Sequence, residues 1–163
     1  MLPDEVARWR NLAEIESNAN VDLEVMLAVI WQESHGNAWA YRYEEGWQYF
    51  VAGGLPLYKK GFGVSVNRAS AYNKLGSTEF HAQSASYGLM QVMGSVAREY
   101  SFEGPLTRLC DPAVSIRIGS QHLWEYGFRR GQHDLETALR RYNGSSAYAV
   151  EVLAKIDSVR SVA

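Results

Sequence analysis

Apolar residues recur at helical spacing near the beginning of the chain. A first helix is predicted from Pro3, because proline followed by two acidic residues suits a first helical turn. Its apolar positions are Val6, Trp9, Leu12 and Ala13. Asp22 is a favourable N-cap for a second helix that ends near Gly36. Apolar residues surround much of this second helix, so we expect it to be buried at the centre of the fold.

The second half of the chain carries start and stop signals for further helices. We expect them at residues 67–75, 88–100, 111–130 and 134–144, and from Ser145 onward. Asp111 and Pro112 form a strong N-cap and first-turn pair for the longest of these helices, which Gly131 would close. Asp134 caps the helix that follows. The pattern therefore predicts a mostly helical protein.

Residues 39–62 lack a helical period and are rich in aromatic and turn-forming residues. Eight of these residues are aromatic, and glycine and proline recur between them. We interpret the segment as an irregular insertion with one short hairpin, around Leu57 to Val66. Buried aromatic clusters are commoner than ligand platforms, so a satellite core is favoured over a ligand cleft. With no linker or repeat, residues 1–163 are expected to form a single domain of the α+β type, mostly α.

Composition and charge exclude several classes of function. The chain has 163 residues and a formal net charge of −2, which argues against a nucleic-acid partner. The single cysteine, Cys110, allows no disulfide within the chain. The four histidines lack the spacing of metal ligands, and we expect neither a metal nor a cofactor.

The N-terminal sequence has charged residues where a secretory signal would be apolar, and the longest apolar run, Val25 to Trp31, is too short to cross a membrane. We therefore expect a monomer that is made in the cytosol without a signal peptide and does not insert into membranes.

Glu33 is the residue with the most unusual predicted environment. It lies in the last turn of the apolar helix, where partial burial and the negative end of the helix dipole both disfavour its charged form. Both effects raise the pKa of a carboxyl group. A carboxylic acid that stays protonated near neutral pH can serve as a general acid.

Three short motifs occur in an order that supports this hypothesis. They are Glu33-Ser34 at the end of the buried helix, then Gly88-Leu89-Met90-Gln91, then Arg141-Tyr142-Asn143-Gly144. With these motifs the chain resembles the soluble lytic transglycosylase family and its relative, goose-type lysozyme. The third motif is approximate, because the family usually has Ala-Tyr-Asn-x-Gly. The resemblance implies a lysozyme-like fold and a peptidoglycan substrate.

The first two motifs lie farther apart than in compact members of the family. The intervening segment is similar to phage lysins of this superfamily, which have an Arg-Tyr-Glu segment (here Arg42-Tyr43-Glu44) and a Thr-Glu pair (here Thr78-Glu79). A second carboxylate is therefore to be sought at Glu44 or Glu79. Either residue could equally form a structural salt bridge, for example with Arg42 or Arg68, and both alternatives stay open.

The resemblance also implies roles for individual residues. Glu33 would protonate the leaving oxygen and then act as a base. Tyr142 would form a hydrogen bond with Glu33 and so orient it. Met90 and Gln91 would line the wall that holds the N-acetyl groups. The remaining candidates for substrate binding have simpler structural explanations, which we favour: Ser84 as a loop serine, Asn143 as a turn residue and Tyr148 as a core residue.

The resemblance favours a lytic transglycosylase that cleaves the β-1,4 bond between N-acetylmuramic acid and N-acetylglucosamine and forms 1,6-anhydro ends. A hydrolytic muramidase on the same scaffold is the first alternative. A non-catalytic glycan-binding or virion structural domain is the second. Without a signal peptide, a phage endolysin, a virion-borne lysin or a bacterial enzyme with a dedicated secretion route would each fit.

Overall fold

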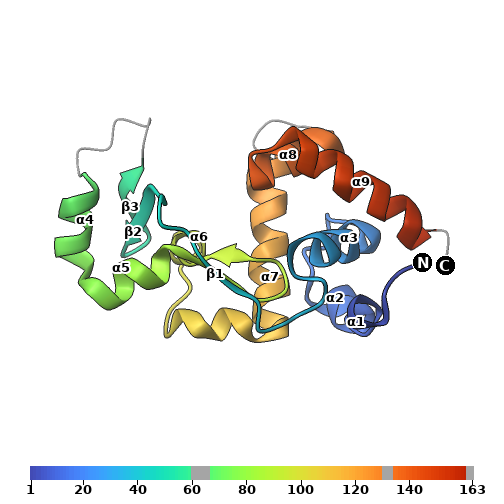
Figure 1. Ribbon diagram of the computed structural model, residues 1–163, viewed down its shortest axis with the longest axis horizontal. Helices are drawn as coiled ribbons and strands as arrows, with labels where there is room; N and C mark the ends of the chain where they lie inside the picture. Colours follow the sequence, from blue (N-terminus) through green and yellow to red (C-terminus); the bar gives the residue numbers. More distant parts are fainter. Residues whose placement is uncertain (60–66, 130–133, 161–163) are drawn as a thin grey trace.

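Helices from the two ends of the chain gather in one lobe, and the middle of the chain forms a smaller lobe beside it (Figure 1). The computed structural model describes residues 1–59, 67–129 and 134–160. The larger lobe contains α1 (Asp4–Ala7), α2 (Arg10–Glu16), α3 (Leu23–Ser34), α7 (Pro112–His122), η2 (Leu123–Arg129), α8 (Leu135–Asn143) and α9 (Ser146–Arg160). The smaller lobe contains β2 (Tyr49–Ala52), β3 (Leu55–Lys59), α4 (Arg68–Leu75) and α5 (Ser77–Gln83).

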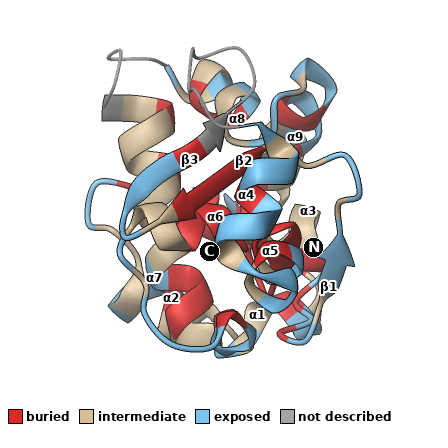
Figure 2. Cartoon of the chain, turned by 90° about the vertical axis from the view of Figure 1, so that its left-hand side faces the viewer, coloured by how far each residue is buried: buried red, intermediate tan, exposed pale blue. Residues whose placement is uncertain are grey.

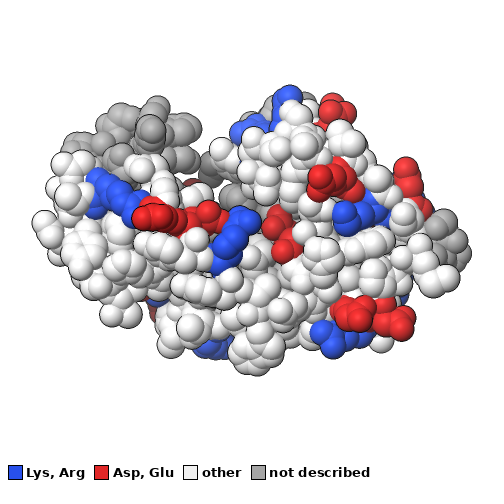
Figure 3. Space-filling model, viewed as in Figure 1, with Lys and Arg blue, Asp and Glu red and all other residues white. Residues whose placement is uncertain are grey.

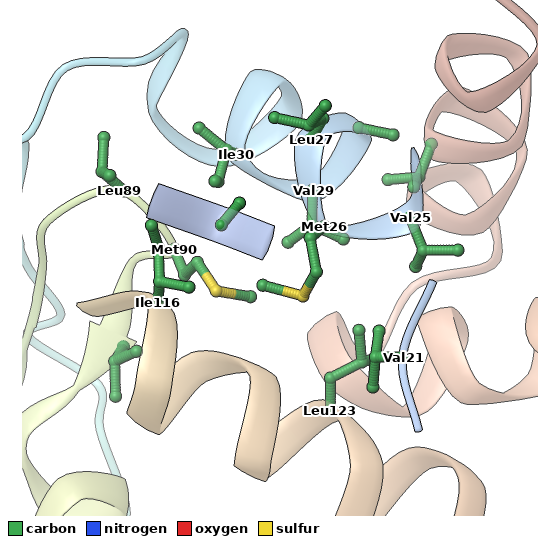
Figure 4. Packing of buried hydrophobic residues seen from close by; sticks show 14 of the residues in the cluster. Val21, Val25, Met26, Leu27, Val29, Ile30, Leu89, Met90, Ile116 and Leu123 are labelled. Atoms are coloured by element: carbon green, nitrogen blue, oxygen red, sulfur yellow. The ribbon is translucent and has the colours of Figure 1, made fainter. Parts of the chain in front are cut away.

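Helix α3 is the buried central helix, as its sequence predicts. Six consecutive residues, Val25 to Ile30, are almost completely inaccessible to solvent. Figure 4 shows that Met26 of α3 and Met90 point toward one another within this core. Burying an aliphatic side chain of this size contributes about 1.5–3 kcal/mol, so α3 is firmly held in place. Asp22 occupies the N-cap position, but its side chain accepts no capping hydrogen bond from the described residues.

The smaller lobe has a hydrophobic core of its own. Phe50, Leu57, Ala71 and Phe80 form this satellite core, and the rings of Phe50 and Phe80 stack with their centroids 4.4 Å apart. The aromatic-rich segment thus contributes Phe50 to a satellite core, as predicted, whereas its residues Trp39, Tyr41 and Tyr43 are exposed. Figure 2 shows β2 buried, whereas β1 (Tyr41–Tyr43) is exposed.

A hairpin in this lobe precedes most of the segment in which one was predicted. Strands β2 and β3 pair around Gly53 and Gly54, whose φ angles of 56° and 74° suit a two-residue turn that favours glycine. Of the segment 57–66, in which a hairpin was predicted, residues 57–59 belong to β3. Residues 60–66 lie outside the described residues.

A small antiparallel sheet lies where the two lobes meet. It contains β1, β4 (Ala85–Tyr87) and β5 (Val92–Met93), in the order β1-β4-β5. Arg42 of β1 is paired with Ser86 of β4, and Ser86 with Met93 of β5. Side chains alternate between the faces of a strand, so these three residues share one face of the sheet.

The predicted helix over residues 88–100 was wrong in its first half. Residues 88–91 form a turn, and α6 (Gly94–Glu99) starts only after β5. Gly88 and Gln91 have φ angles of 74° and 47°, which a right-handed helix does not allow. A Cβ atom on Gly88 would come within 2.2 Å of the Leu109 carbonyl oxygen, so this position requires glycine.

Several other boundaries differ from the sequence prediction. The first helix is broken between Ala7 and Arg10, and α5 was not expected. A short 3-10 helix, η1 (Leu106–Cys110), precedes α7, and the helix begun at Asp111 continues beyond His122 as the π-helix η2. The predicted closure at Gly131 lies outside the described residues.

The capping predictions were more accurate. The side chains of Asp111 and Asp134 each accept the expected hydrogen bond at the start of a helix, and Asn67, for which no cap was predicted, does the same. Over the described residues, no helix has the length and apolar character needed to cross a membrane.

Candidate active site

A cleft of about 300 Å³ lies where the motifs meet. Figure 3 shows a depression between the lobes, along which acidic and basic side chains gather. The residues that line the cleft are Glu33, Arg42, Glu44, Trp47, Ser86, Gln91, Val92, Met93, Val96, His122, Tyr142 and Asn143. The face of the small sheet that carries Arg42, Ser86 and Met93 therefore forms one wall.

Glu33 projects into this cleft from the last turn of α3. The helix ends at His35, which adopts the left-handed conformation of a C-cap. Burial raises the pKa of the Glu33 carboxyl from 4.5 to about 7, against smaller opposing effects from the Tyr148 hydroxyl and the Arg42 guanidinium. The expected rise in pKa is thus present, and burial is its main cause. A group with this pKa is substantially protonated near neutral pH and ionises readily.

Two tyrosines lie beside Glu33, and their arrangement differs from the prediction. The hydroxyl of Tyr142 donates a hydrogen bond of 2.8 Å to the backbone carbonyl of Met90, so the expected bond to Glu33 was wrong. Tyr148 of α9 has its hydroxyl beside the carboxyl and lowers the pKa of Glu33. Among the described residues this hydroxyl completes no hydrogen bond of normal geometry. Tyr148 is therefore a buried residue whose polar end faces the acid.

The second motif supplies one cleft residue rather than two. Gln91 lines the cleft, and its amide nitrogen donates to the carbonyls of Ala40 (3.1 Å) and Gly88 (3.0 Å), while its amide oxygen accepts from the Ser86 hydroxyl (3.0 Å). Gln91 thus fixes the turn between β4 and β5. The side chain of Met90 lies in the core against Gly119, so the predicted contact of Met90 with substrate was wrong.

The two candidate carboxylates have different surroundings. Glu44 lines the cleft and forms an ion pair with Arg42, with 2.5 Å between Oε1 and Nε. Glu79 lies outside the cleft lining and is held by Arg98 at 2.8 and 3.1 Å and by the Gln83 amide at 2.9 Å. The geometry therefore favours the structural alternative for Glu79 and leaves Glu44 as the second carboxylate of the cleft.

Ser84 and Asn143 also lie in different environments. Ser84 is completely buried, and its hydroxyl donates to the Phe80 carbonyl at 2.9 Å, so direct contact with substrate is excluded. The Ser84 carbonyl instead accepts a hydrogen bond of 2.8 Å from the backbone nitrogen of Glu44, which fixes that residue at the cleft. Asn143 is exposed at the end of α8 and lines the cleft.

Several residues of the cleft lining were not singled out from the sequence, among them Trp47 and His122. Trp47 lines the cleft, and its indole nitrogen donates to the Ser95 hydroxyl at 2.8 Å. His122 lines it from the end of α7 and stacks on Tyr126 with ring centroids 5.5 Å apart. Trp47 belongs to the aromatic-rich segment, which gave a weak signal. His122 lies outside every motif, and no sequence signal indicated it.

Over residues 1–59, 67–129 and 134–160, no group of three or more His, Cys, Asp or Glu residues is placed to hold a metal ion.

Comparison with known proteins identifies the family of this arrangement. Residues 10–151 match the family model described as the transglycosylase SLT domain. A search of curated proteins and a search of solved structures each returned no match. The family match covers most of the chain and includes all three motifs with the cleft that they form. The chain therefore belongs to the transglycosylase SLT domain family.

Proposed function

We propose that this domain is a lytic transglycosylase that cleaves the β-1,4 bond between N-acetylmuramic acid and N-acetylglucosamine in peptidoglycan. Family membership supports the reaction and its substrate. The observation that carries the proposed mechanism is Glu33, a carboxyl at the wall of the cleft whose pKa is raised to about 7 by burial. We assign the acid and base steps to this one residue.

In the first step Glu33 acts as the acid. Its proton passes to the glycosidic oxygen, the bond from that oxygen to C1 of the muramic acid breaks, and N-acetylglucosamine leaves with a free hydroxyl. C1 is left as an oxocarbenium-like centre. The raised pKa supports this role because it keeps much of Glu33 protonated near neutral pH.

In the second step Glu33 acts as the base. The carboxylate takes the proton of the C6 hydroxyl of the same muramic acid, and O6 bonds to C1 to close a 1,6-anhydro ring without consuming water. Tyr148 and Arg42 both favour the ionised form of Glu33 and so stabilise the carboxylate between the two steps, while the pKa of about 7 that burial produces leaves it basic enough to take this proton. Glu33 is then protonated again and can cleave the next glycosidic bond.

The role of Glu44 distinguishes this reaction from hydrolysis. It is the other carboxylate among the described residues that line the cleft, and a hydrolytic enzyme could use it to position water. However, its ion pair with Arg42 holds it in place and compensates its charge. We therefore assign Glu44 to holding Arg42 near Glu33, and we favour transglycosylation.

Mass spectrometry of digested peptidoglycan tests the proposal. We expect fragments with anhydromuramic ends, which are one water lighter than reducing ends, and we expect the Glu33→Gln variant to release none of them. Reducing ends as the dominant wild-type product would instead identify a muramidase. Absence of any glycan fragment from the folded wild type would contradict the proposed activity altogether.

We further propose that the domain acts as a phage lysin. The likeness of residues 42–44 and 78–79 to phage lysins supports this more specific role. Expression in a bacterial host tests it. Lysis that requires co-expression of a membrane-permeabilising holin is the expected result, and export and lysis without a holin would contradict it.

A further inference from the structure

Exposed aromatic side chains gather on the outer face of β1. Tyr41 and Tyr43 are 60% and 39% exposed, and they alternate with Arg42, which lines the cleft from the opposite face. The ring of Tyr43 lies 5.9 Å from His81 of α5, and His81 lies 6.1 Å from Tyr72 of α4. We call Tyr41, Tyr43, His81 and Tyr72 the aromatic strip.

The strip differs in chemistry from the rest of the described surface. The large hydrophobic residues that are exposed elsewhere are aliphatic: Met1, Ile15, Leu55 and Val150. Those on and beside the strip are aromatic: Trp39, Tyr41, Tyr43 and Tyr72. Each ring of the strip presents a flat apolar face together with a polar hydroxyl or ring nitrogen. Clustered exposed apolar surface of this kind marks a site of interaction.

The strip ends in a shallow depression on the smaller lobe. This depression is lined by Arg68, Ala69, Tyr72, Asn73 and Phe80. The guanidinium of Arg68 lies over the rings of Phe50 and Phe80 and donates a hydrogen bond to the Trp47 carbonyl, so it is held in place. An aromatic ring flanked by a fixed guanidinium and an amide offers both stacking and hydrogen-bond donors to a neutral polar ligand.

We propose that the aromatic strip is a second binding surface for the glycan strand, outside the catalytic cleft. This inference rests on the proposed function, because it takes the substrate to be a polysaccharide. A cleft of about 300 Å³ lies at the small end of ligand sites, so most of a long glycan strand must lie outside it. The strip begins on the same three-residue strand that carries Arg42 into the cleft. Sugar rings present flat C–H faces that pack on aromatic rings, and their hydroxyls can bond to the tyrosine and histidine edges.

Sedimentation with insoluble glycan tests this surface. The background is Glu33→Gln, so that the glycan stays intact, and the probes are whole sacculi and glycan strands stripped of their stem peptides. Combining Tyr41→Ala with Tyr43→Ala is expected to weaken binding to both probes by about two- to tenfold per ring. Tyr72→Ala is expected to act in the same direction. Leu55→Ala removes an exposed aliphatic side chain outside the strip and should leave binding unchanged.

A substitution series at Tyr43 separates sugar stacking from general apolar contact. Tyr43→Phe keeps the ring and should retain most of the binding, whereas Tyr43→Leu keeps only apolar surface and should lose it. Full binding by Tyr43→Leu, or loss of binding only to sacculi that retain stem peptides, would overturn the proposal. Wild-type self-association that the alanine substitutions abolish would assign the strip to a second copy of the chain, and would also overturn it.

The two proposals fail in different ways. With Glu33 restored, the strip variants should cleave short soluble glycan fragments at the wild-type rate and digest sacculi more slowly. If the wild type cleaves both substrates and the folded strip variants sediment and digest like the wild type, the strip proposal fails alone. If the wild type cleaves neither substrate, the proposed function fails, whatever the sedimentation shows.

Discussion

The Tyr142 hydroxyl donates its hydrogen bond to the backbone carbonyl of Met90, at 2.8 Å. This bond joins the third motif on α8 directly to the turn that the second motif forms after β4. Tyr142 therefore holds the cleft walls together rather than orienting the acid by direct hydrogen bonding. Its position explains how two segments 52 residues apart in sequence keep a fixed geometry around Glu33.

Tyr142→Phe is expected to lower stability more than catalysis. The substitution leaves the Met90 carbonyl without its partner, which costs about 1–3 kcal/mol. For a chain of this size the melting temperature should fall by about 2–4 °C for each kcal/mol. Thermal melting and the rate per folded molecule are the two measurements. A tenfold loss of rate with unchanged melting temperature would show that the hydroxyl acts on the reaction itself.

Glu33→Gln should abolish cleavage and also change how stability depends on pH. The pKa of Glu33 rises from 4.5 to about 7 on folding, so the folded state binds more protons between these values. Wild-type stability therefore falls as pH rises through this window, by up to about 3 kcal/mol. Glutamine cannot ionise, so the variant should melt higher than the wild type at pH 8 and show little difference at pH 4.5. Equal melting temperatures at pH 8 would mean that Glu33 is not buried as described.

The wild-type rate at saturating substrate should fall as pH rises above about 7, because the proton donor is lost. Tyr148→Phe removes the hydroxyl that lowers the pKa of Glu33, so this alkaline limb should move to higher pH. The measurement is a pH–rate profile of both proteins. Tyr41→Phe, on the outer face of β1, is the matched control and should leave the limb in place. If the alkaline limb of the pH–rate profile is unchanged in Tyr148→Phe, the Tyr148 hydroxyl does not affect the pKa of Glu33.

The two remaining carboxylates should respond differently to neutralisation. Burial alone would raise the pKa of Glu79, but its hydrogen bonds to Arg98 and Gln83 outweigh this effect and lower it. The ionised pair therefore stabilises the fold above the ordinary carboxyl pKa, and this stability is lost as pH falls through that range. Glu79→Gln should cost about 1 kcal/mol near neutral pH, after allowance for solvent screening, with the rate per folded molecule unchanged.

Glu44→Gln provides the comparison, because Glu44 lies in the cleft and its partner Arg42 is largely exposed. We expect little change in stability and retained formation of anhydro products. A folded Glu44→Gln enzyme that loses a hydrolytic product would assign the positioning of water to Glu44.

The sequence predicted those parts of the fold that local interactions determine. The caps at Asp111 and Asp134 and the buried helix α3 depend on neighbouring residues, and their patterns are visible in the chain. The helix expected from Gly88 failed because its apolar period resembles a helix, while two left-handed residues break it. Gly88 meets the Leu109 carbonyl, a partner that no local pattern reveals.

The same distinction holds for the cleft. Glu33 could be found from its place at the end of an apolar helix taken together with the three ordered motifs. In contrast, the wall formed by Arg42, Ser86 and Met93 depends on strand pairing between distant segments. Whether the Tyr142 hydroxyl bonds to Glu33 or to the Met90 carbonyl depends on the direction of its side chain within the packed core. Residue type and spacing alone do not determine it.

Strand β1 divides its three residues between two environments, with Arg42 in the cleft and its neighbours on the outer surface. Evolution can therefore change the outer positions without disturbing the chemistry inside, because substitutions at alternating sites are uncoupled. A change in length is a different matter. Inserting or deleting one residue would turn Arg42 outward and a tyrosine inward in a single event. We therefore expect homologous chains to keep the length of this strand, with no insertion or deletion between positions 41 and 43.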